Sequence, residues 1–499
     1  MLDSLVTATL YLADGVTLMY LMLGVLVGLL FGIIPGLGGA TAIALLLPLT
    51  FGMEPEQAIT LMGGIMGSSA IGGSVTAILL NAPGTAPNAA TCFDGYPLTR
   101  QGKAGLAIGA AATASSLGGI VGVIVLVAIL PMAKSLVLLF GPPAFFMLAV
   151  LGLVSLTISN NNMLRGLIAA ALGLFIGFVG YDDMGGTLRF TAGIDYLWDG
   201  IKLVPALIGL FAIAEMIRLM VEGGAISKVD RNELGEVKGV GAGFKAVFKH
   251  PRTVLSGSFI GTLVGIVPGV GGTVASFLSY SFTVQSSRDS SQFGKGDIRG
   301  VIAPEAANNA KDGGSLIPTL AFGIPGSAEM ALFLGVLVLH GMQPGPLLLI
   351  EREWSLLVLI IALLLATIAS ACVIAVATKY LIKITFVDSS ILIPTVLSVA
   401  LVGAYALEGS LGDVIMAAVF GVIGYVMIRL DYPRITLVIA IVLGGMMERN
   451  FIQSMLMFRS DWTGFFRDTT SLVIFTIIVM ALALPVLGRI RRRVRNANV

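Results

Sequence analysis

Long apolar segments separated by short polar connections run along nearly the whole chain. A helix that spans a membrane needs about 20 predominantly apolar residues. Such a segment folds as a helix because lipid offers no hydrogen-bond partners, so the backbone N–H and C=O groups must bond to each other. The pattern predicts an all-α polytopic membrane protein with about eleven transmembrane helices in total. Besides two interrupted crossings described below, spans are predicted at 104–130, 136–157, 163–180, 202–221, 355–378, 391–407, 411–428, 434–447 and 471–488.

One interrupted motif occurs twice in this apolar pattern. Residues 28–41 read GLLFGIIPGLGGAT and residues 261–274 read GTLVGIVPGVGGTV, 233 positions later, with eight of the fourteen positions identical. A proline followed by a glycine cluster breaks a helix at a depth where most membrane helices are continuous. We therefore predict two re-entrant hairpins, at 17–50 and 253–283, each entering and leaving the membrane on one side.

A second interruption follows each hairpin. The first lies at Pro83-Gly84-Thr85, within a broken crossing predicted at about 72–92 after a short arm helix at 58–71. The second lies at Pro325-Gly326-Ser327, within a broken crossing predicted at 313–340 after a polar stretch at 285–311. Broken helices at matching places in two halves are the sequence pattern that marks a transporter's binding site.

Basic residues are distributed unevenly along the connections. None precedes Arg100, whereas the connection 222–252 holds six and the tail 489–499 holds five arginines. Because Lys and Arg favour the cytoplasmic side, the N-terminus is expected in the periplasm and the C-terminus in the cytoplasm. An odd number of crossings then separates the two copies, which predicts an inverted-topology repeat. The predicted units are 1–221 and 253–488, joined by the cytoplasmic linker 222–252 and followed by the basic tail 489–499.

Composition narrows the function. Hydrophobic residues make up 56% of the chain and charged residues 12%, against about 25% charged in ordinary soluble domains. The net charge of +2 gives no sign of nucleic-acid binding. Two histidines, two cysteines and no phosphate-binding loop, dinucleotide fingerprint or nucleophile motif argue against a cofactor, ATP hydrolysis or a membrane-embedded enzyme.

The four breaks carry the candidate chemistry. A helix end carries free N–H groups that suit an anion at its N-terminus and free carbonyls that suit a cation at its C-terminus. A carboxylate substrate with Na⁺ or a proton would use both ends, the ion held through backbone carbonyls. A lone Pro-Gly pair is instead often a kink, and each nearby polar side chain can equally form a helix–helix hydrogen bond. The candidate residues at the breaks are Gly36, Gly38, Gly39, Ser74, Asn81, Pro83, Gly84, Thr85, Gly269, Gly271, Gly272, Ser315, Pro325, Gly326 and Ser327.

Polar residues also precede the second broken crossing, at 303–312 (APEAANNAKD). In a helix, Glu305, Asn308, Asn309 and Asp312 share one face, which is typical of a cavity wall or of a solvated arm helix. We include Asn308, Asn309 and Lys311 among the candidate substrate contacts. Lys311 can bind a substrate carboxylate or pair with Asp312 or Glu305.

Three of these motifs resemble a known family. GIIPGLGG at 32–39, GSVTAILLNAPGTAPNAATCFDGYPL at 73–98 and APEAANNA at 303–310 are similar to the large membrane subunit of tripartite tricarboxylate transporters. The resemblance implies an elevator-type permease of the bacterial inner membrane, with a small membrane subunit and a periplasmic solute-binding protein as partners. It implies uptake of a di- or tricarboxylate by Na⁺ or H⁺ symport. An anion channel and a binding-protein-independent carrier are the alternatives.

Overall fold

The computed structural model describes residues 2–159, 162–182, 186–222, 239–384 and 389–497. Within them the regular secondary structure is helical except for one small antiparallel pair, β1 (Gly180–Tyr181) with β2 (Leu188–Arg189). The chain is a multi-pass membrane protein. Among the described residues, the helices long and apolar enough to cross a membrane are Gly15–Ile33, Pro55–Leu80, Ala104–Ser135, Leu203–Glu222, Glu353–Thr378, Ser389–Glu408, Leu411–Arg429 and Arg434–Met457.

Both predicted hairpins have a helix–tip–helix shape. The first consists of α2 (Gly15–Ile33) and α3 (Gly38–Leu46), followed by the 3₁₀ turn η1 (Leu47–Gly52). The second consists of α12 (Pro251–Ile266) and α13 (Gly271–Ser286). The tips use glycine at equivalent places with positive φ: +88° at Gly36 and +79° at Gly269, then +64° at Gly38 and +73° at Gly271. Glycine adopts this left-handed backbone without steric cost.

The first broken crossing begins earlier than the sequence indicates. Helix α4 (Pro55–Leu80) is continuous, so the separate arm at 58–71 and the start at 72 are wrong. Glycines destabilise an isolated helix, but the glycines of α4 let it pack closely on α2. At Gly64, for example, an added Cβ would lie 2.7 Å from the Leu21 carbonyl oxygen. After the break come the short η2 (Ala86–Asn88) and α5 (Ala89–Arg100); α1 (Leu2–Leu12) precedes the hairpin.

The second broken crossing shows the same difference. Helix α14 (Arg299–Phe322) includes the polar 303–312 segment, and its residues 300–321 are all buried. The connection before this crossing therefore ends at 298 rather than 311, and the crossing starts at 299 rather than 313. Because residues 303–312 are buried within α14, the interpretation of this segment as a solvated arm helix is wrong. The break leads into α15 (Ala328–Leu339), and the short α16 (Pro346–Glu351) follows.

Corresponding backbone hydrogen bonds join each hairpin to the break in its own half. The N–H of Gly36 donates to the Gly84 carbonyl at 3.2 Å, and the N–H of Gly269 donates to the Gly326 carbonyl at 3.2 Å. Each break also begins with a left-handed residue, Asn81 (φ 52°) after α4 and Gly323 (φ 68°) after α14. The two halves therefore repeat one backbone unit.

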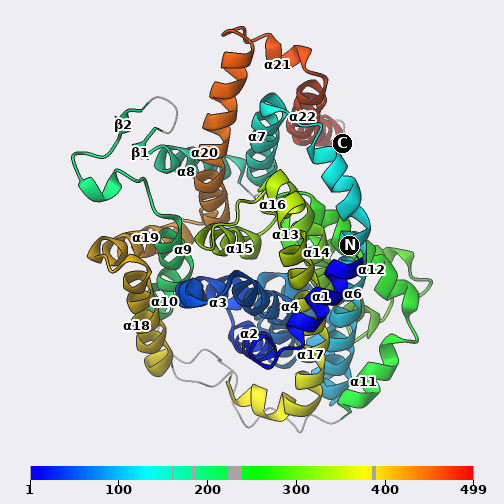
Figure 1. Ribbon diagram of the computed structural model, residues 1–499. Coiled ribbons are helices and arrows are strands. Elements are labelled where there is room, and N and C mark those ends of the chain that lie inside the picture. Colours follow the sequence, from blue (N-terminus) through cyan, green and yellow to red (C-terminus); the bar gives the residue numbers. More distant parts are fainter. Residues whose placement is uncertain (1, 160–161, 183–185, 223–238, 385–388, 498–499) are drawn as a thin grey trace.

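We call α2–α5 and α12–α15 the central unit and α7–α10 with α18–α22 the peripheral unit (Figure 1). Long helices α6 (Ala104–Val137) and α17 (Glu353–Ile384) pack on the central unit, where α6 also contacts α11 (Val240–Val247). The peripheral helices are α7 (Pro142–Ser159), α8 (Met163–Gly177), α9 (Leu203–Leu207), the π-helix η4 (Ile208–Ile213), α10 (Ala214–Glu222), α18 (Ser389–Glu408), α19 (Leu411–Arg429), α20 (Arg434–Met457), α21 (Gly464–Arg467) and α22 (Thr469–Ala497).

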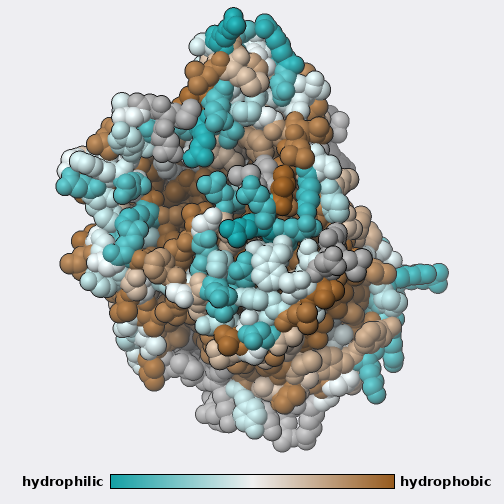
Figure 2. Space-filling model, in the orientation of Figure 1, coloured by the Kyte–Doolittle hydropathy of each residue, from teal (hydrophilic) through white to brown (hydrophobic). Residues whose placement is uncertain are grey.

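The two units meet where α3 packs on η4 and α15 packs on α20. Helix α20 has 24 residues, so the predicted 14-residue span 434–447 is too short. Its second half contains the polar residues Glu448, Arg449, Asn450, Gln453 and Ser454. Figure 2 shows hydrophilic residues gathered at the top of the view, where α20 leads into α21 in Figure 1. Helix α22 continues into the predicted tail 489–499, and most of the predicted linker, 223–238, lies outside the described residues.

Candidate functional site

A cavity of about 400 Å³ lies where both hairpin tips and both breaks meet. Segments more than two hundred residues apart in the sequence therefore share one wall. Twelve of the eighteen candidate residues line it: Gly36, Gly38, Gly39, Gly84, Thr85, Gly269, Gly271, Gly272, Asn308, Lys311, Gly326 and Ser327.

The other six candidates lie outside the lining, and several of them make contacts within the protein. Ser74 donates to Glu305 Oε2 at 2.6 Å, and Asn309 Nδ2 donates to the Gly67 carbonyl at 3.5 Å. Asn81 ends α4, and Ser315 is buried in α14. The six are Ser74, Asn81, Pro83, Asn309, Ser315 and Pro325.

Glu305 is a fully buried carboxylate that receives hydrogen bonds from four elements of the first half, α4, η2, α5 and α6. Asn88 Nδ2 donates to Oε1 at 3.1 Å, and the hydroxyl of Thr91 donates to the same oxygen. Ser74 and Ser115 donate to Oε2, Ser115 at 2.9 Å. Within the described residues no cation pairs with Glu305, which rules out one of the alternatives left open for Lys311, the pair with Glu305. These bonds instead fix α14 against α4, α5 and α6.

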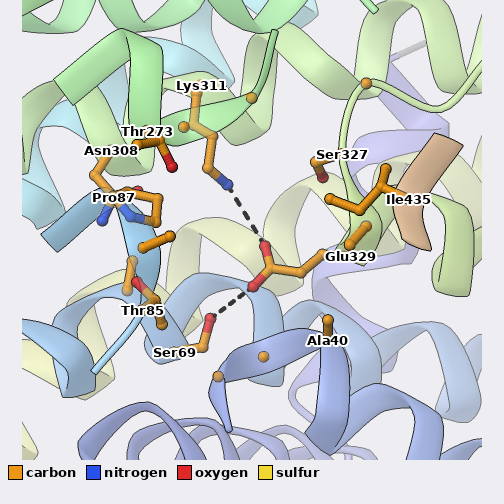
Figure 3. A pocket seen from close by; sticks show the side chains of 18 of the residues that line it. Ala40, Ser69, Thr85, Pro87, Thr273, Asn308, Lys311, Ser327, Glu329 and Ile435 are labelled. Atoms are coloured by element: carbon orange, nitrogen blue, oxygen red, sulfur yellow. Dashed lines mark hydrogen bonds and ion pairs between the residues drawn. The ribbon is translucent and has the colours of Figure 1, made fainter. Parts of the chain in front are cut away.

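Lys311 carries positive charge into the cavity, and two carboxylates hold it. Its ammonium pairs with Asp312 and lies 3.5 Å from Glu329 Oε2. Ser69 Oγ donates to Glu329 Oε1 at 3.2 Å. Figure 3 shows Lys311 and Ser69 approaching the Glu329 carboxylate from opposite sides. The Glu329 side chain thus connects the second half, through Lys311, to the first, through Ser69.

Sequence reasoning did not find Glu329 or Ser69. Glu329 lies in the first turn of α15, directly after the break, where a helix N-terminus favours a negative side chain, and this position was an available signal. Ser69 is one of several hydroxyl residues within α4, and only its contact with Glu329 distinguishes it.

The peripheral unit supplies the other side of the cavity. Ile435 of α20 lines it. Nearby, Glu215 pairs with Arg218 at 2.5 Å and with Arg434 at 3.5 Å. Arg218 reaches the first hairpin tip, because a Cβ added to Gly36 would lie 2.3 Å from its Nη2. The cavity therefore lies at the boundary between the central and peripheral units.

Asn308 is the polar residue of the cavity wall whose side chain is least satisfied. It is 1% exposed, and neither its Oδ1 nor its Nδ2 has a hydrogen-bond partner within the described structure. A buried polar group left in this state costs about 1–3 kcal/mol. A polar ligand or ordered water in the cavity would remove that cost. Among the described residues, no group of three His, Cys, Asp or Glu side chains is placed to hold a metal ion.

Comparison with known proteins identifies a family that the chain matches over most of its length. Residues 18–439 match the model of the "Tripartite tricarboxylate transporter TctA family". The chain belongs to this family. The predicted resemblance is confirmed, and because the family is one of transporters, the expectation of a transport protein rather than an enzyme is confirmed with it.

Two relatives come from Agrobacterium vitis. The "Uncharacterized 52.8 kDa protein in TAR-I ttuC' 3'region" is 33% identical over 485 residues, which are 96% of this chain and 95% of the relative. The "Uncharacterized protein in TAR-II ttuC' 3'region" is 32% identical over 237 residues, 47% of this chain and 96% of the relative. Among solved structures, none matches the chain.

Proposed function

We propose that the chain is the large permease subunit of a secondary transporter that imports di- or tricarboxylates by cation symport. It would work in the bacterial inner membrane with a small membrane subunit and a periplasmic solute-binding protein, as its family implies. The observation that carries the proposal is the meeting of four helix breaks at one cavity. N–H groups in the first turns of the helices that follow the breaks, together with the unpaired amide of Asn308, would offer hydrogen bonds to carboxylate oxygens there.

The charge inside the cavity supports symport. Lys311 contributes one positive charge against the two carboxylates of Asp312 and Glu329. An anion entering this cluster finds the ammonium of Lys311 already paired, and a cation that enters with the anion would balance its charge where water is excluded. A proton on Glu329, or Na⁺ at the carbonyls of the breaks, would supply that cation. A channel for anions alone has no need of such a cluster.

The arrangement of units supports an elevator-type movement. Both hairpins, both breaks and the charged cluster belong to the central unit, while the peripheral unit contributes Ile435 to the cavity. A central unit that slides past the peripheral unit would carry the cavity from one side of the membrane to the other. The inverted repeat predicted from loop charges provides two equivalent end states for that movement.

Reconstitution into liposomes tests the function. The chain would be combined with the small subunit and candidate binding proteins, and uptake of radiolabelled citrate and succinate measured under imposed Na⁺ or proton gradients. We expect saturable uptake that requires one gradient and a binding protein. Flux without saturation or gradient dependence would indicate a channel, and full uptake without any binding protein would indicate an independent carrier.

Topology has a separate test. In a background without Cys92 and Cys372, single cysteines replace Glu54, which precedes α4, or Ser287, which follows α13. A membrane-impermeant thiol reagent added to intact cells should label the first position only. Labelling of both positions from outside would contradict the inverted repeat while leaving the family assignment intact.

A further inference from the structure

A second cavity, of about 700 Å³, lies at the open end of the second hairpin, where α12 begins and α13 ends. It is separate from the substrate cavity, because no residue lines both. Basic and hydroxyl side chains dominate its wall, and no described Asp or Glu belongs to the lining. The residues on which the inference rests are Lys249, His250, Arg252, Ser287, Arg288 and Arg299.

Three of the positive charges are free to bind a ligand. Arg299 is occupied: its Nη2 pairs with Asp297 at 2.6 Å and its Nη1 donates to Ser287 Oγ at 3.2 Å. These bonds hold the start of α14 against the end of α13 and shape the cavity wall. Lys249, Arg252 and Arg288 form no ion pair within the described part of the chain.

His250 adds a polar ring without charge to this wall. Burial, and then the neighbouring charge of Arg299, lower the pKa of His250 below its usual value. The lowered pKa favours the neutral ring, which can donate or accept a hydrogen bond.

An exposed apolar stripe runs along α12 away from the basic cavity. Leu255 is 59% exposed, Phe259 61% and Leu263 48%, and their spacing of four residues places them on one helix face. Phe282 of α13, 49% exposed, lines the cavity itself. A basic pocket that continues into an apolar stripe matches a molecule with a charged head and hydrocarbon chains. A small soluble anion would occupy the basic pocket alone and make no contact with the stripe.

We propose that the basic cavity binds the phosphate headgroup of an anionic phospholipid, whose acyl chains lie along the Leu255–Phe259–Leu263 stripe. The unequal distribution of Lys and Arg predicts that this end of the hairpin lies on the cytoplasmic side. Arg252 and Arg288 provide planar donor groups that suit phosphate oxygens, and Lys249 adds a point charge. Basic pockets between membrane helices on that side are suited to anionic headgroups. The lipid would hold the base of one of the two hairpins that form the substrate cavity.

Native mass spectrometry of the purified full-length chain tests the proposal. Phosphatidylglycerol and cardiolipin would be titrated against phosphatidylcholine. The site variant is Lys249→Gln/Arg252→Gln/Arg288→Gln. The matched control, Arg100→Gln/Lys103→Gln/Lys295→Gln, removes the same charge from exposed residues on the same predicted side, outside the cavity. We expect tight binding of the anionic lipids to wild type and control, and at least about tenfold weaker binding to the site variant.

Two further measurements separate the sources of phosphate. Leu255→Ser/Phe259→Ser should weaken lipid binding, and millimolar inorganic phosphate should not displace the lipid. Displacement by phosphate together with unchanged lipid binding by the stripe variant would indicate a site for a soluble anion and overturn the proposal. Equal losses in the site and control variants, or no loss in the site variant, would overturn it as well.

Discussion

The two halves of the central unit share a backbone and differ in side chains. Each has a hairpin tip with two left-handed glycines, a break after a long helix, and an N–H···O=C bond of 3.2 Å between them. In the first half the long helix, α4, presents hydroxyl groups such as Ser69 and Ser74. In the second half the long helix, α14, presents Glu305, Lys311 and Asp312.

This difference shows that the same backbone unit, present twice, can carry two different sets of side chains. The first half supplies neutral donors, and the second supplies the charges that those donors satisfy, as the Ser74–Glu305 and Ser69–Glu329 bonds show. Because the polar partners lie on opposite halves, the cavity requires both halves to be packed together. The comparison of the two halves therefore predicts that substitutions at equivalent positions change the stability of the protein by different amounts.

The largest effect is expected from Lys311→Met. Removing the ammonium leaves the Asp312 and Glu329 carboxylates together with no cation between them, and breaking a buried ion pair costs about 3–5 kcal/mol. We expect a large fall in melting temperature in detergent and loss of uptake. Glu329→Gln in the Lys311→Met background should recover part of the stability. A single variant as stable as wild type would contradict the charge assignment.

The second largest effect is a difference in stability between alanine substitutions of two equivalent glycines, Gly84 and Gly326, one in each break. A Cβ on Gly84 would lie 2.0 Å from the Gly32 carbonyl oxygen, whereas a Cβ on Gly326 would lie 3.1 Å from the nearest Ser315 atoms. Overpacking lowers the free energy of unfolding by about 1–3 kcal/mol. Gly84→Ala should therefore lower the free energy of unfolding by at least about 1 kcal/mol, and Gly326→Ala should lower it by less than about 1 kcal/mol. Thermal unfolding of the two purified variants measures the difference. Equal losses would mean that the halves are packed alike.

A smaller effect is expected from Glu305→Gln. The new amide group can face Ser74 and Ser115, whose hydroxyls can rotate to accept, while its oxygen keeps the donors Asn88 and Thr91. The loss is the charge assistance of these bonds, about 1–2 kcal/mol. Glu305→Ala, which leaves four donors unsatisfied, should lose more. Melting temperatures of both variants test this order, and a larger loss for Glu305→Gln would contradict it.

The smallest effect on stability is expected from Asn308→Ala. Its amide has no partner within the described residues, so its removal should leave the melting temperature unchanged or slightly higher. If the amide binds the carboxylate, the substrate affinity should fall about tenfold, or about 1.4 kcal/mol. Asn309→Ala is the control, since it loses the bond to Gly67 and should lower stability without changing affinity. The reverse pattern would place the substrate elsewhere.

Local signals explain why the breaks were predictable. The Pro-Gly clusters at 35–39 and 268–272 interrupt a helix through their own backbone chemistry, so both tips appear in the structure where the sequence indicates them. The first long helix was harder to predict. Glycines at positions such as Gly64 favour an interruption locally, but packing against α2 makes that helix continuous.

The partners of the charged side chains could not be predicted for a different reason. Spacing within 303–312 places Glu305 and Asn308 on one helix face, yet their surroundings depend on residues up to 231 positions away, such as Ser74. The sequence left Lys311 with three alternatives, a substrate carboxylate, Asp312 or Glu305, and in the structure its ammonium pairs with Asp312 and Glu329. Burial decides such pairings, because an ion removed from water must find a partner wherever the fold provides one.

The sequence alone determined that this protein is a helical membrane protein with two copies of an interrupted motif, because apolar length and Pro-Gly chemistry act locally. It also determined the family, which the comparison confirmed. The tertiary structure decided that the four interruptions meet at one cavity and that α14 is buried. It also decided that Glu329 faces Lys311. These features depend on packing between segments distant in the chain, where contacts outweigh the local preferences of each segment.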